Sequence, residues 1–244
     1  MDAEQPPSFD QLKELNDQFD QQLQALERNQ PRNFSLSWKK MLLKVLLGIV
    51  ALPLPFFLLV RVSVFMYHNY QTNGWLALSM GCLATIILLL LYGGVFVYKF
   101  GMGKKAITYI FRGVLVLVVA YTFYGMLYYS SLNTKTEEIH SYYRSLHPIM
   151  RVALTTVTLA DSDIIVTDIQ RSAKDYRRMG LSENEHSLHY VQADGYVHAV
   201  DLRTKGRPWW KNWIFEHSFK LLGLSTIRHV GTADHLHVYL PLNK

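Results

Sequence analysis

Three long runs of apolar residues dominate the middle of the chain, between a polar amino-terminal segment and a mixed carboxy-terminal half. The runs cover Met41–Met66, Trp75–Tyr98 and Ile107–Tyr129. Each exceeds the roughly 20 residues that an α-helix needs to cross the hydrocarbon core of a bilayer. Pro53 and Pro55 lie inside the first run and predict a break there, because proline removes a helical hydrogen bond. Residues 39–130 are therefore predicted to form three transmembrane α-helices.

The amino-terminal segment, residues 1–38, has the pattern of an amphipathic helix from Ser8 to Arg28, ended by Asn29 to Asn33. Apolar residues recur there at steps of three and four, which places them on one face. They are Phe9, Leu12, Leu15, Phe19, Leu23 and Leu26. Two interpretations stay open. The helix lies on the membrane or on the protein's own spans, or residues 9–28 form a short coiled coil that makes the chain a homo-oligomer.

Basic residues flank the apolar runs unevenly, and this predicts how the chain is oriented. The basic flanking residues are Lys39, Lys40 and Lys44 before the first run, and Lys99, Lys104, Lys105 and Arg112 around the second link. The first link, residues 68–74, contains no lysine or arginine. Short loops that carry such residues stay in the cytoplasm. The amino terminus is therefore predicted to be cytoplasmic, and everything after Tyr129 to lie on the far side of the membrane.

The rest of the chain is predicted to hold a helical stalk, residues 131–160, followed by a folded domain, residues 161–244. Alternating and β-branched stretches predict strands at Ile164–Asp168, Val197–Leu202, Ser225–Val230 and His235–Leu240. Helices are predicted at Ala173–Met179 and Trp209–Leu222, each followed by a glycine. Short strands with helices between them indicate an α+β domain.

Composition narrows the chemistry that this domain can perform. The formal net charge is +6, but much of the excess flanks the apolar runs, so it gives no support to nucleic-acid binding. The single cysteine, Cys82, lies in the second run, which excludes an intramolecular disulfide and a cysteine-based site in the domain. Nine of the ten histidines follow Asn133. Histidine is therefore the residue type from which we expect a functional site in this domain to be built.

The spacing of two histidines and one aspartate suggests a metal site. His235 and His237 are two apart on a predicted strand, so both can face one site. His189 stands before a turn-rich stretch, and Asp201 lies on the strand that follows it. Two histidines and one carboxylate leave an open position on zinc, which a hydrolytic metal needs.

These segments resemble the motif set of the LAS-type zinc peptidases. The matching pieces are Ser187-Leu188-His189, Ala199-Val200-Asp201-Leu202-Arg203 and His235-Leu236-His237. That group includes D-alanyl-D-alanine carboxypeptidases, L-alanyl-D-glutamate endolysins and the hedgehog signalling domain. The resemblance covers about Ile164 to Leu240 and implies a LAS-type metallopeptidase-like fold. It also implies that Zn²⁺ is bound by His189, Asp201 and His237.

The resemblance implies roles for three further residues. Asp234 occupies the position of the acidic base, three residues before the last ligand, although many members have glutamate there. The Arg171-Ser172 pair is similar to one that helps hold the substrate, so Arg171 is the expected substrate contact. His235 is expected to orient the water or a ligand.

The chain departs from the family pattern in one spacing. The first histidine and the aspartate are seven positions apart in the family, whereas His189 and Asp201 are twelve apart. An extra loop centred on Gln192 to Tyr196 would restore the geometry. The rival ligand is His198, but residues three apart on a strand face opposite sides, so His198 and Asp201 would need a bulge to converge.

The implied function is hydrolysis of peptide bonds in peptidoglycan by an inner-membrane zinc peptidase whose domain lies in the periplasm. Its partners would be peptidoglycan stem peptides and membrane lipid. The alternative is a non-catalytic zinc-containing domain that binds cell wall or a protein within an oligomeric membrane assembly.

Overall fold

The computed structural model describes residues 8–28, 34–127, 133–178, 180, 182, 186–231 and 234–242. The chain divides into two units, Met1–Ala51 and Leu52–Lys244. The first unit contains helix α1 (Phe9–Arg28) and helix α2 (Phe34–Ala51). In α1 the described apolar side chains of the predicted face are all exposed, from Phe9 to Leu23. The amphipathic helix is thus present, while its role in oligomerisation stays a prediction; Asn29 to Asn33 lie outside the described residues.

Two helices of the second unit, α4 (Gly74–Phe100) and α5 (Lys104–Leu127), are long and apolar enough to cross a membrane. A third crossing results if α2 and α3 (Leu54–Tyr70) are counted as one broken span. The break between α2 and α3 falls at Leu52 and Pro53, where prolines were expected to interrupt the first span. Length and composition therefore support two or three crossings, and their orientation stays a prediction. Tyr128 and Tyr129 lie outside the described residues.

Helices α3 and α4 approach each other closely where their residues are small. The Ser63 hydroxyl donates a hydrogen bond to the Leu59 carbonyl, with 2.7 Å between the oxygens. A Cβ atom added to Gly81 of α4 would overlap both of these groups. Small residues at helix crossings permit this backbone approach within membranes.

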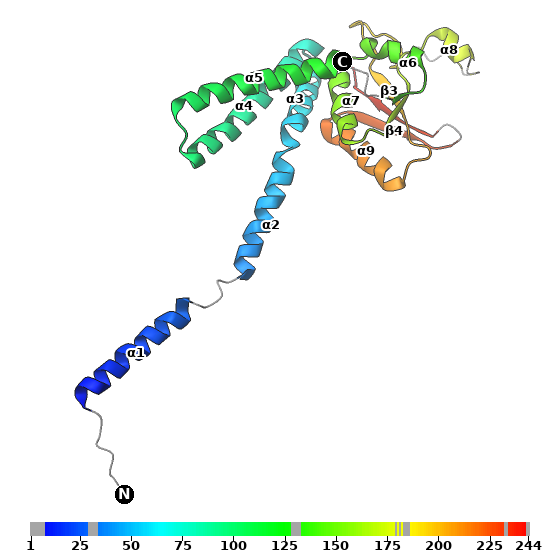
Figure 1. Ribbon diagram of the computed structural model, residues 1–244. Helices are drawn as coiled ribbons and strands as arrows, with labels where there is room; N and C mark the ends of the chain where they lie inside the picture. Colours follow the sequence, from blue (N-terminus) through cyan, green and yellow to red (C-terminus); the bar gives the residue numbers. More distant parts are fainter. Residues whose placement is uncertain are drawn as a thin grey trace. The chain divides into compact units, whose positions relative to one another are not determined.

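The segment predicted as a helical stalk is built from several short elements and one packed helix. They are β1 (Asn133–Thr134), α6 (Glu137–Ser141), a 3₁₀ turn (Tyr142–Ser145) and α7 (Pro148–Ala160). Helix α7 contacts α3, α4, α5 and the later helix α9 (Trp209–Leu222), and most of its side chains are buried. Tyr143 in the 3₁₀ turn donates a hydrogen bond to the carbonyl of Gly125 in α5, over 2.5 Å. Helix α7 therefore lies between the spans and the sheet (Figure 1). Its buried side chains belong to one apolar core with both.

The carboxy-terminal part forms a small sheet with the order β1-β2-β3-β5-β4. Its further strands are β2 (Ile165–Asp168), β3 (Ala199–Arg203), β4 (Ser225–His229) and β5 (His235–Tyr239). Only β1 and β2 run parallel among the described strands. Helix α8 (Ala173–Arg178) follows β2, and α9 (Trp209–Leu222) lies between β3 and β4 in sequence. The predicted strands and the two predicted helices are confirmed within one or two residues, so the domain is α+β.

Alternation along the central strands sorts the side chains between two faces of the sheet. In β5, Leu236 and Val238 are fully buried, whereas His235, His237 and Tyr239 are only partly covered. Successive strand residues point to opposite faces. The apolar residues therefore build the core, and the histidines are left on the open face.

Candidate metal centre

Strand pairing places Asp201 and His237 directly opposite each other on β3 and β5. His189 reaches them from the turn that follows α8 in sequence, and that turn is held by side-chain hydrogen bonds. The Tyr176 hydroxyl donates to the Ser187 hydroxyl over 2.7 Å, and the backbone N–H of His189 donates to the same oxygen over 3.3 Å. Ser187 thus shapes the turn that presents His189.

The structure brings His189, Asp201 and His237 together as a group that could hold a metal ion. His237 Nδ1 lies 2.8 Å from Asp201 Oδ1, and His189 Nε2 lies 3.3 Å from the same oxygen. The two imidazole nitrogens are 3.3 Å apart. Ligands of tetrahedral zinc at their usual bond lengths are separated by roughly 3.3 Å. The three atoms are therefore spaced as donors around one small cation would be.

The second ring nitrogen of His189 fixes which nitrogen faces the group. His189 Nδ1 is 2.7 Å from the carbonyl oxygen of Ile169, and a carbonyl can only accept. Nδ1 therefore carries the hydrogen, and Nε2 presents a lone pair to the group. Histidines that bind metals almost always donate their outer N–H in this way. This arrangement fits a metal ligand.

Arg171 holds the second carboxylate oxygen of Asp201, the one that His189 and His237 do not contact. Its Nη2 donates to Asp201 Oδ2 over 2.5 Å, and its Nε donates to Asp168 Oδ2 over 2.5 Å. Burial alone would raise the pKa of the Asp201 carboxyl, but the neighbouring His189 and His237 rings and the charge of Arg171 lower it overall. Asp201 is therefore a carboxylate, which is the form that binds a cation.

The carboxylate of Asp234, the expected base, accepts hydrogen bonds from two other side chains. Arg228 donates to both carboxylate oxygens over 2.9 Å each, and the Thr204 hydroxyl donates to Oδ1 over 2.7 Å. The hydrogen bond from Arg228 is the main cause of a lowered pKa at Asp234. His235 lies beside the donor group, with Nε2 3.8 Å from Asp201 Oδ2 and its ring stacked on His229.

His198, the rival ligand, is not part of this group. Its Nε2 lies 2.8 Å from Asp194 Oδ2, and the two residues form a second group with His147. His198 and Asp201 thus belong to different groups, as strand alternation predicted.

The twelve-residue spacing between His189 and Asp201 is absorbed by a tight turn. Val191 and Val197 form an antiparallel bridge, and the N–H of Gln192 donates to the Tyr196 carbonyl over 2.8 Å. Gly195 has a φ of 85°, which favours glycine because no Cβ atom is present to clash. The residues between the valines therefore form a small hairpin, named here the 191–197 hairpin, as the extra loop predicted.

His147 and Asp194 were not identified as site residues from the sequence. His147 lies more than forty residues before the other two, and nothing in the sequence pattern links them. Asp194 and His198 are four apart around Gly195, and a turn at that glycine is the signal that could have paired them.

An open cavity of about 1060 Å³ lies over the first group. Besides His189, Asp201 and His237, its lining includes four basic residues. They are Lys135, Arg171, Arg203 and Lys205. Cationic side chains around a cavity favour ligands that carry carboxylates.

Comparison of the chain with family models, with curated proteins and with solved structures gave no significant match.

Proposed function

We propose that this chain is a membrane-anchored zinc peptidase that hydrolyses peptide bonds of peptidoglycan on the far side of a bacterial inner membrane. The observation that carries the proposal is the spacing of the His189, Asp201 and His237 donor atoms beneath an open cavity. The resemblance of these residues to LAS-type motifs supports the substrate class. The uneven lysines and arginines around the apolar helices support the orientation.

Each of the chain's own residues has a part in this proposal. His189, Asp201 and His237 would hold the zinc ion, and Arg171 would fix the Asp201 carboxylate in place. Bound there, zinc would lower the pKa of a water molecule to about 7 and polarise the peptide carbonyl. Arg203 and Lys205 line the cavity and would pair with carboxylates of stem peptides.

The proposed function predicts that metal removal abolishes hydrolysis reversibly. The full-length protein in detergent is incubated with purified peptidoglycan sacculi, and soluble muropeptides are measured by chromatography. We expect release by the zinc-loaded protein, none after chelation, and recovery when zinc is returned. If the zinc-loaded protein binds sacculi without releasing fragments, it is a non-catalytic wall-binding protein and the peptidase proposal fails.

The proton acceptor is proposed to be His235 instead of Asp234. Imidazole is the side chain best suited to accept and return a proton near neutral pH, and His235 lines the cavity beside Asp201. Asp234 lines the same cavity, but its oxygens already accept hydrogen bonds from Arg228 and Thr204.

Two substitutions separate these candidates. We expect His235→Ala to lower the hydrolysis rate by about 10²–10⁴-fold while zinc content is unchanged. Asp234→Asn should lower it by less than about tenfold, since a part-exposed ion pair contributes about 0–1 kcal/mol. The rates are compared at saturating substrate. A larger loss in Asp234→Asn than in His235→Ala would reverse the assignment.

A further inference from the structure

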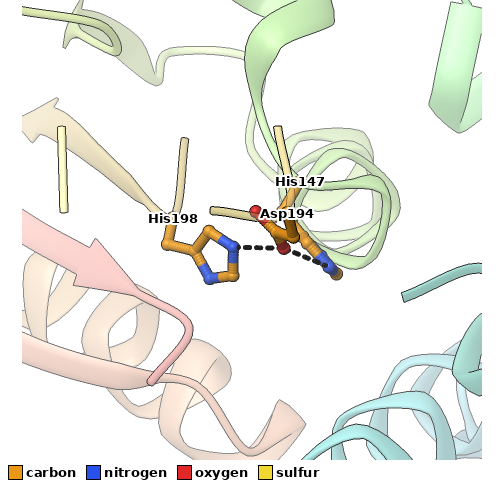
Figure 2. A group of neighbouring side chains, drawn as sticks. All are labelled: His147, Asp194 and His198. Carbon is orange, nitrogen blue, oxygen red and sulfur yellow. Dashed lines mark hydrogen bonds and ion pairs between the residues drawn. The ribbon is translucent and has the colours of Figure 1, made fainter. Parts of the chain in front are cut away.

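A second group of potential ligands lies outside the proposed active site. His147 immediately precedes α7, Asp194 belongs to the 191–197 hairpin, and His198 immediately precedes β3. Figure 2 shows the three side chains pointing toward one another from these separate segments. Both imidazoles are fully buried, whereas the Asp194 side chain is 38% exposed. The group is therefore reached from solvent on the aspartate side.

The contacts of His198 require more hydrogen-bond donors than its neutral ring can supply. His198 Nδ1 lies 3.3 Å from the Leu240 carbonyl oxygen and Nε2 lies 2.8 Å from Asp194 Oδ2, and both oxygens can only accept. A neutral imidazole carries one hydrogen, so one of its two nitrogens must turn a lone pair toward an acceptor. Two acceptors that face each other repel. A positively charged species between them, either a proton or a metal ion, removes the repulsion.

His147 distinguishes a metal ion from a proton. Its Nε2 is buried without a hydrogen-bond partner among the described residues, and it lies 3.9 Å from the same Asp194 oxygen. A proton shared by His198 and Asp194 would leave this nitrogen unsatisfied. A metal ion would engage all three donors, whose separations of 2.8 and 3.9 Å lie on either side of the roughly 3.3 Å of tetrahedral zinc.

We propose that His147, Asp194 and His198 bind a second divalent metal ion of the zinc class, distinct from the ion of the proposed active site. The His147 ring is fully buried, and burial disfavours the charged form of an imidazole. Neutral imidazole is the form that binds metals. Coordination through Nε2 puts the ring hydrogen on Nδ1, so the long 3.3 Å contact from the Ile149 N–H is given up.

The position of this group indicates a structural role. The ring of Tyr67 in α3 packs on His147 with 5.0 Å between centroids, and a Cβ on Gly74 of α4 would overlap the same ring. Trp75 of α4 donates a hydrogen bond to the Tyr196 hydroxyl of the hairpin over 3.2 Å. An ion here would join the start of α7, the hairpin and β3 at the point where they meet the apolar helices.

Metal stoichiometry of the full-length protein in detergent tests this proposal. Each variant is equilibrated with zinc, freed of excess by gel filtration, and analysed by inductively coupled plasma mass spectrometry. We expect two zinc ions per chain in the wild type, one in Asp194→Asn, one in His237→Ala, and none in the double variant. His217→Ala, which removes a part-exposed histidine of α9 outside both groups, should keep two.

The design separates this proposal from the peptidase proposal. Asp194→Asn keeps the size of a part-exposed side chain, so it is expected to fold, and a gel-filtration profile like the wild type checks this. His198→Gln should also bind one ion. If Asp194→Asn and His198→Gln hold as much zinc as the wild type, the second site does not bind metal and the proposal is overturned. If only His237→Ala loses zinc, the proposed active-site metal stands while the second metal site is refuted.

Discussion

Replacing His237 by alanine is expected to remove one zinc ion per chain and to abolish muropeptide release. His237 supplies one of three donor atoms, and its Nδ1 also contacts Asp201. Loss of an outer partner of a metal ligand already weakens zinc binding by about 10–100-fold, so loss of a ligand should exceed about 100-fold. Hydrolysis should fall to the level of the chelated wild type.

Zinc affinity is measured by competition with a chromophoric chelator, and hydrolysis by the sacculus assay. His217→Ala is the matched control because it removes a histidine without touching the donor group, and it should keep both properties. Full hydrolysis by a His237→Ala protein that retains its zinc would refute the assignment of the metal centre.

Leu154→Ala is expected to destabilise the protein by about 2–5 kcal/mol, as large-to-small changes in packed cores do. Leu154 is 1% exposed in α7, at the centre of the core that α7 shares with α3, α4 and α5. Leu159 lies on the same helix and is 58% exposed. Leu159→Ala should therefore change stability by less than about 0.5 kcal/mol.

Thermal unfolding in one detergent, followed by circular dichroism, compares the two leucine variants with the wild type. The large effect at Leu154 follows only if α7 is packed against its neighbours. Equal midpoints for Leu154→Ala and Leu159→Ala would mean that α7 stands apart from the spans as a stalk.

The elements that could be predicted from sequence are those whose pattern is local. Alternation in β5 placed His235 and His237 on one face, and antiparallel pairing then set Asp201 opposite His237. The same alternation separated His198 from Asp201. The break before α3 was predictable because proline has a local effect on the backbone.

The features that could not be predicted depend on contacts between distant segments. The ion pair of Asp234 with Arg228 needs β4 to lie beside β5, and no sequence pattern fixed that pairing. His147 meets Asp194 and His198 only because α7 packs beside the sheet. The apolar pattern of residues 131–160 suggested a helix, but it did not indicate that α7 is enclosed by other helices.

The hydroxyl of Tyr143 donates a hydrogen bond to the Gly125 carbonyl, and the guanidinium of Arg151 donates one to the Met126 carbonyl. Both carbonyls lie at the end of α5. A domain joined to the spans by a flexible linker would take many heights and orientations above the bilayer. A domain fixed to a span by hydrogen bonds keeps a constant height and tilt. Under the proposed function, the cavity would reach only those peptidoglycan strands that come to that height, so the spacing between wall and membrane would help to determine which bonds are cut.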